Sequence, residues 1–182
     1  NLVEAPGGTL ITNVRPIVQL FDTNQKGITN LSLDLYLNNA TLNKSVVIDN
    51  SSVLITEDVV FDAVKLSVTD AYDFDINISD AIDVLRHIVD LEALTAGSSS
   101  YHAADVDNNG TVNISDAIDI LRHIVDLEAI DTFDLIDSDG ARVTTLDADA
   151  TGEAPTWTIV ANGDVDMSGS FAEDYIVSSE LV

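Results

Sequence analysis

The first part of the chain alternates apolar and polar residues, as β-strands with one buried face do. The clearest example is the segment 31–37, LSLDLYL, in which leucine occupies every second position. Similar runs follow at 45–48, 53–56 and 59–68. Strand-like runs at a spacing of about ten residues are typical of small all-β domains. The pattern predicts five or six strands in residues 1–68, which we interpret as a β-sandwich, immunoglobulin-like or transthyretin-like.

From residue 77 the apolar period changes to that of a helix. The segment 77–94, NISDAIDVLRHIVDLEAL, returns 36 residues later as 113–130, NISDAIDILRHIVDLEAI, with two differences. In both copies a Ser-Asp pair precedes isoleucine and leucine residues at helical spacing, which predicts an N-terminally capped helix. The sequence therefore contains a tandem duplication. The small, polar segment 95–100 between the copies is predicted to be a loop.

After residue 131 the pattern is again that of strands separated by turns. Runs at 132–136, 142–146 and 156–160 alternate with Asp/Asn/Gly turn signals. We expect a small β region here, which is either separate or packed on the first sheet. The predicted fold class is thus mixed α and β, with three regions at 1–68, 69–131 and 132–182.

Charge changes the picture more than composition does. The 182 residues include 32 acidic and only 7 basic side chains, a formal net charge of -25, although 46% of the residues are hydrophobic. Such a chain can form a core, but it repels nucleic acid and anionic membranes and attracts multivalent cations. It has no cysteine, and we find no run of roughly eighteen apolar residues, so we expect neither disulfides nor membrane insertion.

The segment 105–116, DVDNNGTVNISD, has the spacing of a calcium-binding loop. It places oxygen-bearing side chains at loop positions 1, 3, 5, 9 and 12 and glycine at position 6, where the loop turns sharply. Calcium prefers six to eight oxygen ligands. The expected ligands are Asp105, Asp107, Asn109, the carbonyl group of Thr111, a water near Asn113, and both carboxylate oxygens of Asp116. The alternative is an Asp/Asn/Gly surface turn that caps a helix and binds nothing.

The equivalent segment of the first repeat is less regular. The 36-residue offset places Asp73 at position 5, Phe74 where glycine is expected, Asp75 at position 7 and Asp80 at position 12. One residue is missing upstream, so Asp70 would have to stretch to act as the first ligand. We predict a second calcium site, with a degenerate loop that only caps the helix as the alternative.

A third candidate loop lies near the C-terminus. Asp164, Asp166, Ser168 and Ser170 reproduce loop positions 1, 3, 5 and 7, but position 12 is Tyr175. Calcium binding and a plain acidic turn remain equally open for this segment. The shorter acidic segments 137–140 and 147–149 are predicted to be plain turns.

The two repeats resemble dockerins, whose calcium loops are each followed by a helix without the entering helix of an EF-hand. The aspartate at position 12 and the lack of an amphipathic helix before Asp105 carry this resemblance, which covers residues 70 to about 131. It implies an antiparallel helix pair, two bound calcium ions, and docking to a cohesin-like or other extracellular protein domain. The partner-binding positions that it implies are Ile78, Ser79, Leu85, Arg86, Ile114, Ser115, Leu121 and Arg122. The alternative is that the leucines are core and the arginines only offset acidic neighbours.

Catalysis finds little support in the sequence. His87 and His123 occupy equivalent helix positions, each four residues after an aspartate, a spacing typical of local surface pairs. We find no nucleophile motif and no phosphate-binding loop, and we predict that the chain is not an enzyme. Two functions remain. One is a calcium-binding interaction module of a secreted or cell-surface protein, and the other is a calcium-rigidified segment of an adhesin-like protein that has no cohesin partner.

Overall fold

The structure is a computed structural model of the chain and describes residues 2–4, 10–12, 17–38, 41–67, 71–148 and 153–177. Two short strands, β1 (Leu2–Glu4) and β2 (Leu10–Thr12), pair with each other in antiparallel fashion. The seven strands of the main sheet are β3 (Ile17–Phe21), β4 (Leu31–Leu37), β5 (Thr41–Asp49), β6 (Ser52–Leu54), β8 (Ala63–Leu66), β10 (Phe133–Asp137) and β12 (Thr156–Ala161).

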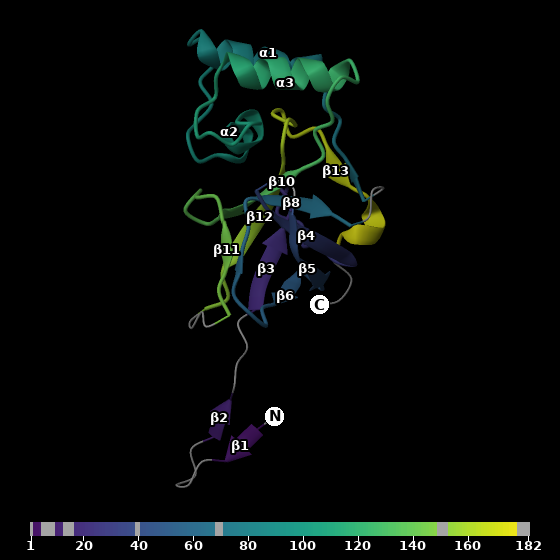
Figure 1. Cartoon of the computed structure of the whole chain (residues 1–182), viewed down its shortest axis with the longest axis vertical. Coiled ribbons are helices and arrows are strands. Elements are labelled where there is room, and N and C mark those ends of the chain that lie inside the picture. The colour runs from purple at the N-terminus through teal and green to yellow at the C-terminus, as the bar shows by residue number, and fades with distance from the viewer. Residues whose placement is uncertain are drawn as a thin grey trace.

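These seven strands form a closed barrel in the order β10-β12-β3-β6-β5-β4-β8 (Figure 1). Pairing of Phe133 in β10 with Val64 in β8 closes the circle. The described barrel strands pair in antiparallel fashion except β12 and β3, which are parallel. Closure leaves the barrel without an open edge strand, which removes a site for aggregation.

The alternation in β4 explains why this segment is a strand. Leu31, Leu33 and Leu35 are 0–1% exposed, whereas the polar residues between them are only half-buried. Successive side chains of a strand point to opposite faces, so the leucines enter the barrel core together. Phe133 and Ile159 of the C-terminal strands join the same hydrophobic cluster.

The expected fold class, a β-sandwich with a dockerin-like pair of antiparallel helices and a small C-terminal β region, is wrong. The described chain is mostly β, and its largest unit is the closed seven-stranded barrel, accompanied by three short α-helices. Alternation identifies a strand with one buried face, but it does not identify the neighbouring strand. Here β10 and β12 pair with β8 and β3 across a long stretch of sequence, which no local pattern encodes.

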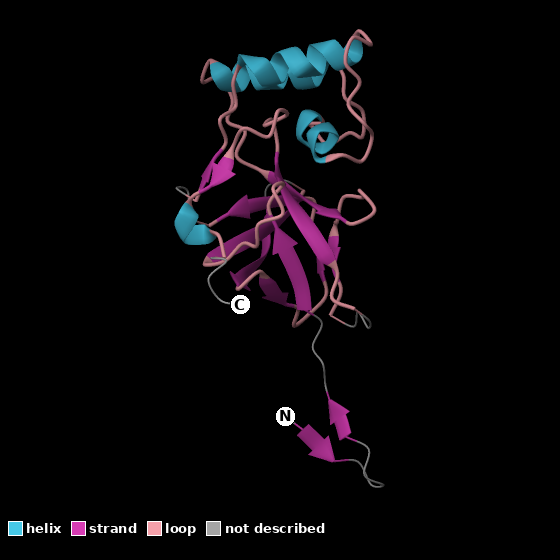
Figure 2. Ribbon diagram, turned by 180° about the vertical axis from the view of Figure 1, so that it is seen from behind, coloured by secondary structure: helices cyan, strands magenta, loops and turns pink. Residues whose placement is uncertain are grey.

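The helices α1 (Ile78–Ile88), α2 (Ser99–Ala104) and α3 (Ile114–Ile124) form a layer at one end of the barrel (Figures 1 and 2). Helices α1 and α3 lie side by side as the outermost elements, with α2 between them and the barrel. Helix α2 overlaps the segment that was predicted to be a loop, and the Ser98 side chain caps it by accepting a hydrogen bond from Tyr101 N. Its C-cap is Asp105, so a short helix does precede the segment 105–116, contrary to the expectation from sequence. None of the described helices is long and apolar enough to cross a membrane.

Four shorter elements complete the described structure. They are β7 (Val59–Val60), β9 (Tyr72–Asp73), β11 (Thr145–Leu146) and β13 (Ser170–Phe171), with a 3-10 turn at Glu173–Tyr175. Strand β11 pairs with β7, and β13 pairs with β9 just before α1 begins. The second pairing brings the C-terminal segment next to the start of the helical layer.

A buried ion pair joins strand β10 to the segment that follows its turn. Asp134 is 1% exposed, and its Oδ1 lies 2.7 Å from Nε of Arg142. Burial raises the pKa of Asp134 to about 6, and the nearby positive charge of Arg142 opposes that rise. A buried carboxylate that loses its partner is strongly destabilising.

We predict that Arg142→Met lowers the free energy of unfolding by about 3–5 kcal/mol at pH 7, where Asp134 is ionised. The folded-state pKa of Asp134 lies above its ordinary value of 3.8 and rises further without Arg142. Because the folded wild-type carboxyl is protonated below its pKa of about 6, the penalty should shrink by about 1.4 kcal/mol between pH 7 and pH 5. Urea unfolding of the wild-type and variant proteins at pH 7 and pH 5, at one fixed calcium concentration, measures both effects. Lys44→Met, which breaks the exposed pair with Glu57, should cost less than about 1 kcal/mol. Equal penalties for the two variants would contradict the prediction.

Candidate metal centres

Two groups of three carboxylates lie at the N-terminal ends of α1 and α3. Among the described residues, these are the groups in which three possible ligand atoms all lie within 4.8 Å of one another. The contiguous cluster consists of Asp105, Asp107 and Asp116. The split cluster consists of Asp80, Asp164 and Asp166, which come from distant parts of the chain.

The contiguous cluster has the hydrogen bonds of a preformed loop. Asn109 N donates to Oδ1 of Asp105 and to Oδ1 of Asp107, both at 3.0 Å. Gly110 N donates to the other oxygen of Asp105 at 2.9 Å. Asp107 N approaches Oδ1 of Asp116 at 3.4 Å. The backbone therefore wraps around the three carboxylates and turns their oxygens toward one point.

The split cluster repeats these four contacts. Ser168 N donates to Oδ1 of Asp164 at 3.0 Å and to Oδ1 of Asp166 at 2.9 Å. Gly169 N donates to the other oxygen of Asp164 at 3.1 Å. Asp166 N donates to Oδ1 of Asp80 at 3.1 Å. Segment 164–169 thus takes the part of 105–110, and Asp80 takes the part of Asp116.

The second half of the split loop comes from the residues just before α1. The Asn77 amide donates to the carbonyl of Asp75 at 2.8 Å, and the Asn113 amide donates to the carbonyl of Thr111 at the same distance. In both copies the asparagine N-cap and the aspartate three residues later form a capping box. Positions 7, 9 and 12 of the split loop are therefore supplied by 75–80, and positions 1, 3 and 5 by 164–168.

Backbone conformation supports the equivalence of the two loops. The residue at position 4 has a positive φ in both, 57° at Asn108 and 59° at Met167. Position 6 requires glycine for a different reason in each loop. Gly110 has a φ of +87°, whereas a Cβ on Gly169 would lie 2.6 Å from both the Asp73 carbonyl oxygen and Oδ2 of Asp164. Gly169 thus allows the C-terminal segment to approach β9.

Burial follows the same order in both clusters. The residues at positions 1 and 12 are buried, and those at position 3 are exposed. Burial raises the pKa of Asp164 to about 6 and also raises the pKa values of Asp80 and Asp116 above the ordinary aspartate value. The neighbouring Asp80 adds to the rise at Asp164, and a hydrogen bond from Tyr72 at 3.0 Å opposes it.

The six carboxylates make no ion pair with a lysine or arginine of the described chain. Their recorded hydrogen bonds come from backbone N–H groups, from the Asn109 amide and from the Tyr72 hydroxyl. Three carboxylates so close together repel one another unless protons or a cation neutralise them. Carboxylate, amide, hydroxyl and carbonyl oxygens in this arrangement match the ligands that hard divalent cations prefer.

The sequence-predicted metal ligands are distributed differently from expectation. Asp105, Asp107, Asn109, Thr111 and Asp116 come together as one loop. Of the residues predicted for the first loop, Asp80 enters the split cluster, whereas the exposed carboxylates of Asp73 and Asp75 belong to neither group of three. Asp70 lies outside the described residues.

The sequence pattern implied a separate C-terminal candidate loop, but in the structure this loop shares its cluster with another segment. Asp164 and Asp166 share a cluster with Asp80, and Ser168 lies at position 5, while Ser170 pairs with Asp73 in the β9–β13 ladder. The sequence did contain a signal for this combination. The segment 70–80 lacks a regular first half, and 164–170 lacks an acidic position 12, so the two segments are complementary halves.

The predicted partner-binding residues lie on the outer side of the helical layer. Ile78 and Ile114 are 55% and 54% exposed, and Leu85 and Leu121 are both 38% exposed. Ser79 and Ser115 are also exposed. Arg86 and Arg122 are exposed too, but each is paired with two carboxylates of its own repeat. Sequence reasoning missed further exposed apolar residues at helical spacing, namely Ile82, Val89, Ile118 and Val125.

His87 and His123 lie in the last turns of the repeated helices. Nδ1 of His87 accepts a hydrogen bond from Leu94 N at 3.0 Å, and Nδ1 of His123 accepts one from Ile130 N at 2.9 Å. The aspartates that precede them, Asp83 and Asp119, lie beside the arginines instead. These histidines therefore fasten the chain that leaves each helix.

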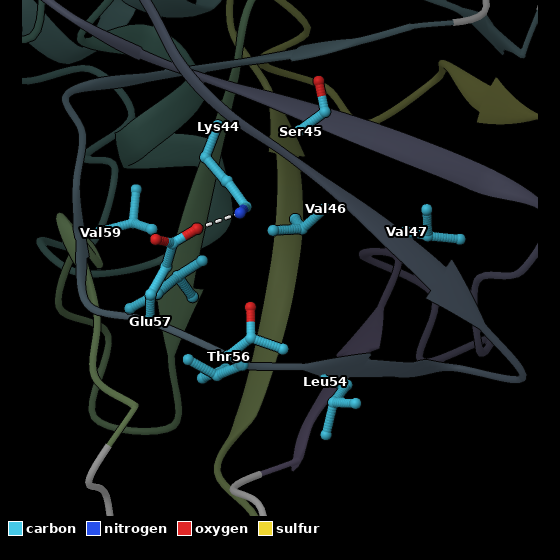
Figure 3. Close-up of a pocket in the computed structure, with 10 residues that line it drawn as sticks. Lys44, Ser45, Val46, Val47, Leu54, Thr56, Glu57 and Val59 are labelled. Atoms are coloured by element: carbon cyan, nitrogen blue, oxygen red, sulfur yellow. Dashed lines mark hydrogen bonds and ion pairs between the residues drawn. The ribbon is translucent and has the colours of Figure 1, made fainter.

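Two hollows of the described surface border barrel strands. One hollow of about 120 Å³ lies beside β5 and β6 and is lined largely by valine and leucine side chains (Figure 3). Across it, Lys44 forms an ion pair with Glu57. A larger hollow of about 450 Å³ lies between the barrel and the contiguous cluster. Its lysine, Lys65, is paired with Asp131 at 3.0 Å.

Comparison with known proteins gives no relative: no family model, no curated protein and no solved structure matches this chain.

We predict that Gly169→Ala destabilises the protein by about 1–3 kcal/mol, because the added methyl group must push apart the C-terminal segment and β9. Chemical unfolding measures the loss. Ser170→Ala, a change at the exposed neighbouring residue, should stay within about 0.5 kcal/mol. If the two variants were equally stable, the close approach at Gly169 would be refuted.

Proposed function

We propose that this chain is a calcium-binding protein–protein interaction module of a secreted or cell-surface protein. The partner would be a cohesin-like domain or another extracellular protein domain. We assign it no catalytic activity. The observation that carries the proposal is that the two carboxylate clusters lie at the N-terminal ends of the two helices whose outer faces are apolar and uncovered.

Calcium is the cation that best fits both clusters. Each loop offers carboxylates at positions 1, 3 and 12, an amide or hydroxyl oxygen at position 5 and a carbonyl at position 7, which is the ligand order of calcium loops. Magnesium prefers a smaller octahedral shell and keeps several of its waters. The lack of cysteine and the formal charge of -25 add a general demand for divalent counter-ions.

The extracellular assignment follows from calcium availability. Extracellular calcium modules commonly have dissociation constants of roughly 10⁻⁴–10⁻³ M. The calcium concentration of the resting cytosol does not reach this range. A cysteine-free chain of this size outside the cell gains from metal ions what other secreted domains gain from disulfides. The resemblance of the repeats to dockerins, which dock through their helices, supports the interaction role.

We predict that calorimetric titration of the metal-free protein detects two calcium ions. Asp116→Ala should remove one, and Asp80→Ala should remove the other. Asp164→Ala should remove the same ion as Asp80→Ala, although the two residues are 84 positions apart, so the double variant Asp80→Ala/Asp164→Ala should still bind one ion. Calcium at about 100 times its Kd should stabilise each intact site by about 2.7 kcal/mol.

Asp73→Ala and Asp75→Ala are the matched controls, because both remove an exposed carboxylate near α1 that belongs to neither cluster and both keep the backbone carbonyl of residue 75 at position 7. They should keep the stoichiometry of two. Absence of both heat and thermal stabilisation on adding calcium would refute the proposed function. Loss of an ion in Asp75→Ala but not in Asp164→Ala would restore the contiguous first loop.

A second candidate function is a calcium-rigidified structural segment that has no cohesin partner. The split cluster favours it, because its carboxylates join α1 to the chain that leaves barrel strand β12. A calcium ion bound there would hold the helical layer on the barrel. The same ion serves both candidate functions, since a fixed layer also presents its outer face in one orientation.

For this second role we predict a local change in hydrogen exchange. In Asp164→Ala, calcium should no longer slow the exchange of backbone amides in 165–172, while the amides of 105–116 keep their calcium-dependent protection. Asp105→Ala should give the opposite pattern. Peptide-resolved exchange with and without a chelator measures both. If calcium leaves 165–172 unchanged in the wild-type protein, the structural role is excluded.

A further inference from the structure

We propose that the partner of the helical layer presents an apolar surface edged with lysine and arginine side chains. This inference rests on the interaction function proposed above and specifies the chemistry of the partner.

The helical layer carries an apolar surface that nothing in the described chain covers. It consists of four residues from each repeat, at the spacing i, i+4, i+7 and i+11, and we call it the outer stripe: Ile78, Ile82, Leu85, Val89, Ile114, Ile118, Leu121 and Val125. These side chains are 38–61% exposed. Residues at this spacing lie on one face of a helix.

Each repeated helix already buries a different face. Ala81 and Val84 of α1 and Ala117 and Ile120 of α3 are 0–1% exposed and form the core of the layer. One apolar face is enough to attach a helix to its domain. The outer stripe is therefore additional to what folding requires. Apolar patches of this kind mark interaction sites.

The two halves of the outer stripe lie on neighbouring helices. Helices α1 and α3 contact each other and are the outermost elements at their end of the barrel, with α2 between them and the barrel (Figures 1 and 2). Leu91 and Leu127, directly after the helices, are 79% and 74% exposed. A partner that covers α1 thus also meets α3.

The charges of the two repeats are predominantly negative. Outside the metal clusters, each repeat carries three acidic residues and one arginine between its helix start and its final glutamate. The acids are Asp83, Asp90 and Glu92 in the first repeat, and Asp119, Asp126 and Glu128 in the second.

Both arginines are already engaged by these acids. Arg86 lies 3.1 Å from Asp83 and 3.6 Å from Glu92, and Arg122 makes the equivalent pairs at 3.7 Å and 3.2 Å. The edge therefore keeps a net negative charge in each repeat. A second copy of the chain or an anionic membrane would meet like charge here, whereas a cationic edge would be complementary.

The test uses a synthetic amphipathic helix whose apolar leucine face is bordered by lysine. Its binding to the calcium-loaded protein is followed by fluorescence anisotropy. Ile82→Gln/Ile118→Gln should weaken binding by about tenfold or more, because the peptide loses its apolar contacts. The control Val47→Gln/Val60→Gln removes two exposed valines outside the helical layer, one in barrel strand β5 and one in β7, and should change affinity less than about twofold.

The charge of the edge is tested separately. Asp90→Asn/Asp126→Asn should weaken binding several-fold and reduce its salt dependence. Glu153→Gln/Glu173→Gln removes two exposed charges elsewhere and should have little effect. Equal weakening by both pairs would mean attraction by total charge alone and would overturn the inference.

Two further outcomes would also overturn it. Binding of a leucine/glutamate peptide through the same stripe would refute the cationic partner while leaving the docking function intact. A homodimer that Ile82→Gln/Ile118→Gln dissociates, detected by analytical ultracentrifugation, would make a second copy the occupant. Calcium stoichiometry is independent of all these outcomes, so failure here is distinguishable from failure of metal binding.

Discussion

Repulsion between buried carboxylates at the starts of α1 and α3 is the constraint on which the helical layer depends. Asp80 and Asp116 close the capping boxes of the two helices and also lie within 4.8 Å of two other aspartates. The carboxylates that cap the two helices are thus also members of the negatively charged clusters. Backbone N–H groups relieve part of that charge, and a divalent cation would relieve the rest. Helix capping and the proposed metal binding therefore depend on the same carboxylates in this molecule.

The split cluster makes this constraint reach the barrel. Asp164 and Asp166 follow β12, so they meet Asp80 only when β12 lies in the closed barrel and β13 pairs with β9. The contiguous cluster needs only a twelve-residue turn. Two nearly identical helices thus have unequal requirements, because closing a long loop costs more conformational entropy than closing a short one. The first helix completes its site through tertiary structure and the second through local structure.

Local pattern predicted the elements that depend on local interactions. Alternation identified β4, β10 and β12, the duplication identified α1 and α3, and the spacing of 105–116 identified the contiguous cluster. What failed was non-local. The parallel pairing of β12 with β3 belongs to a closed barrel in place of the expected sandwich. The 36-residue offset also could not indicate that Asp80 lies beside Asp164 and Asp166. Helical period likewise indicated apolar residues on the two helices, but not that Ala81 would be covered and Ile82 exposed.

The large negative charge and the exposed stripe have opposite effects on self-association. An uncovered surface of isoleucine, leucine and valine favours self-association, because burying it against another copy releases water. A formal charge of -25, with acids bordering the stripe in both repeats, opposes that association. The same acids do not oppose a partner of opposite charge. The acidity of this chain can therefore keep the stripe free in solution while leaving it available to a cationic surface.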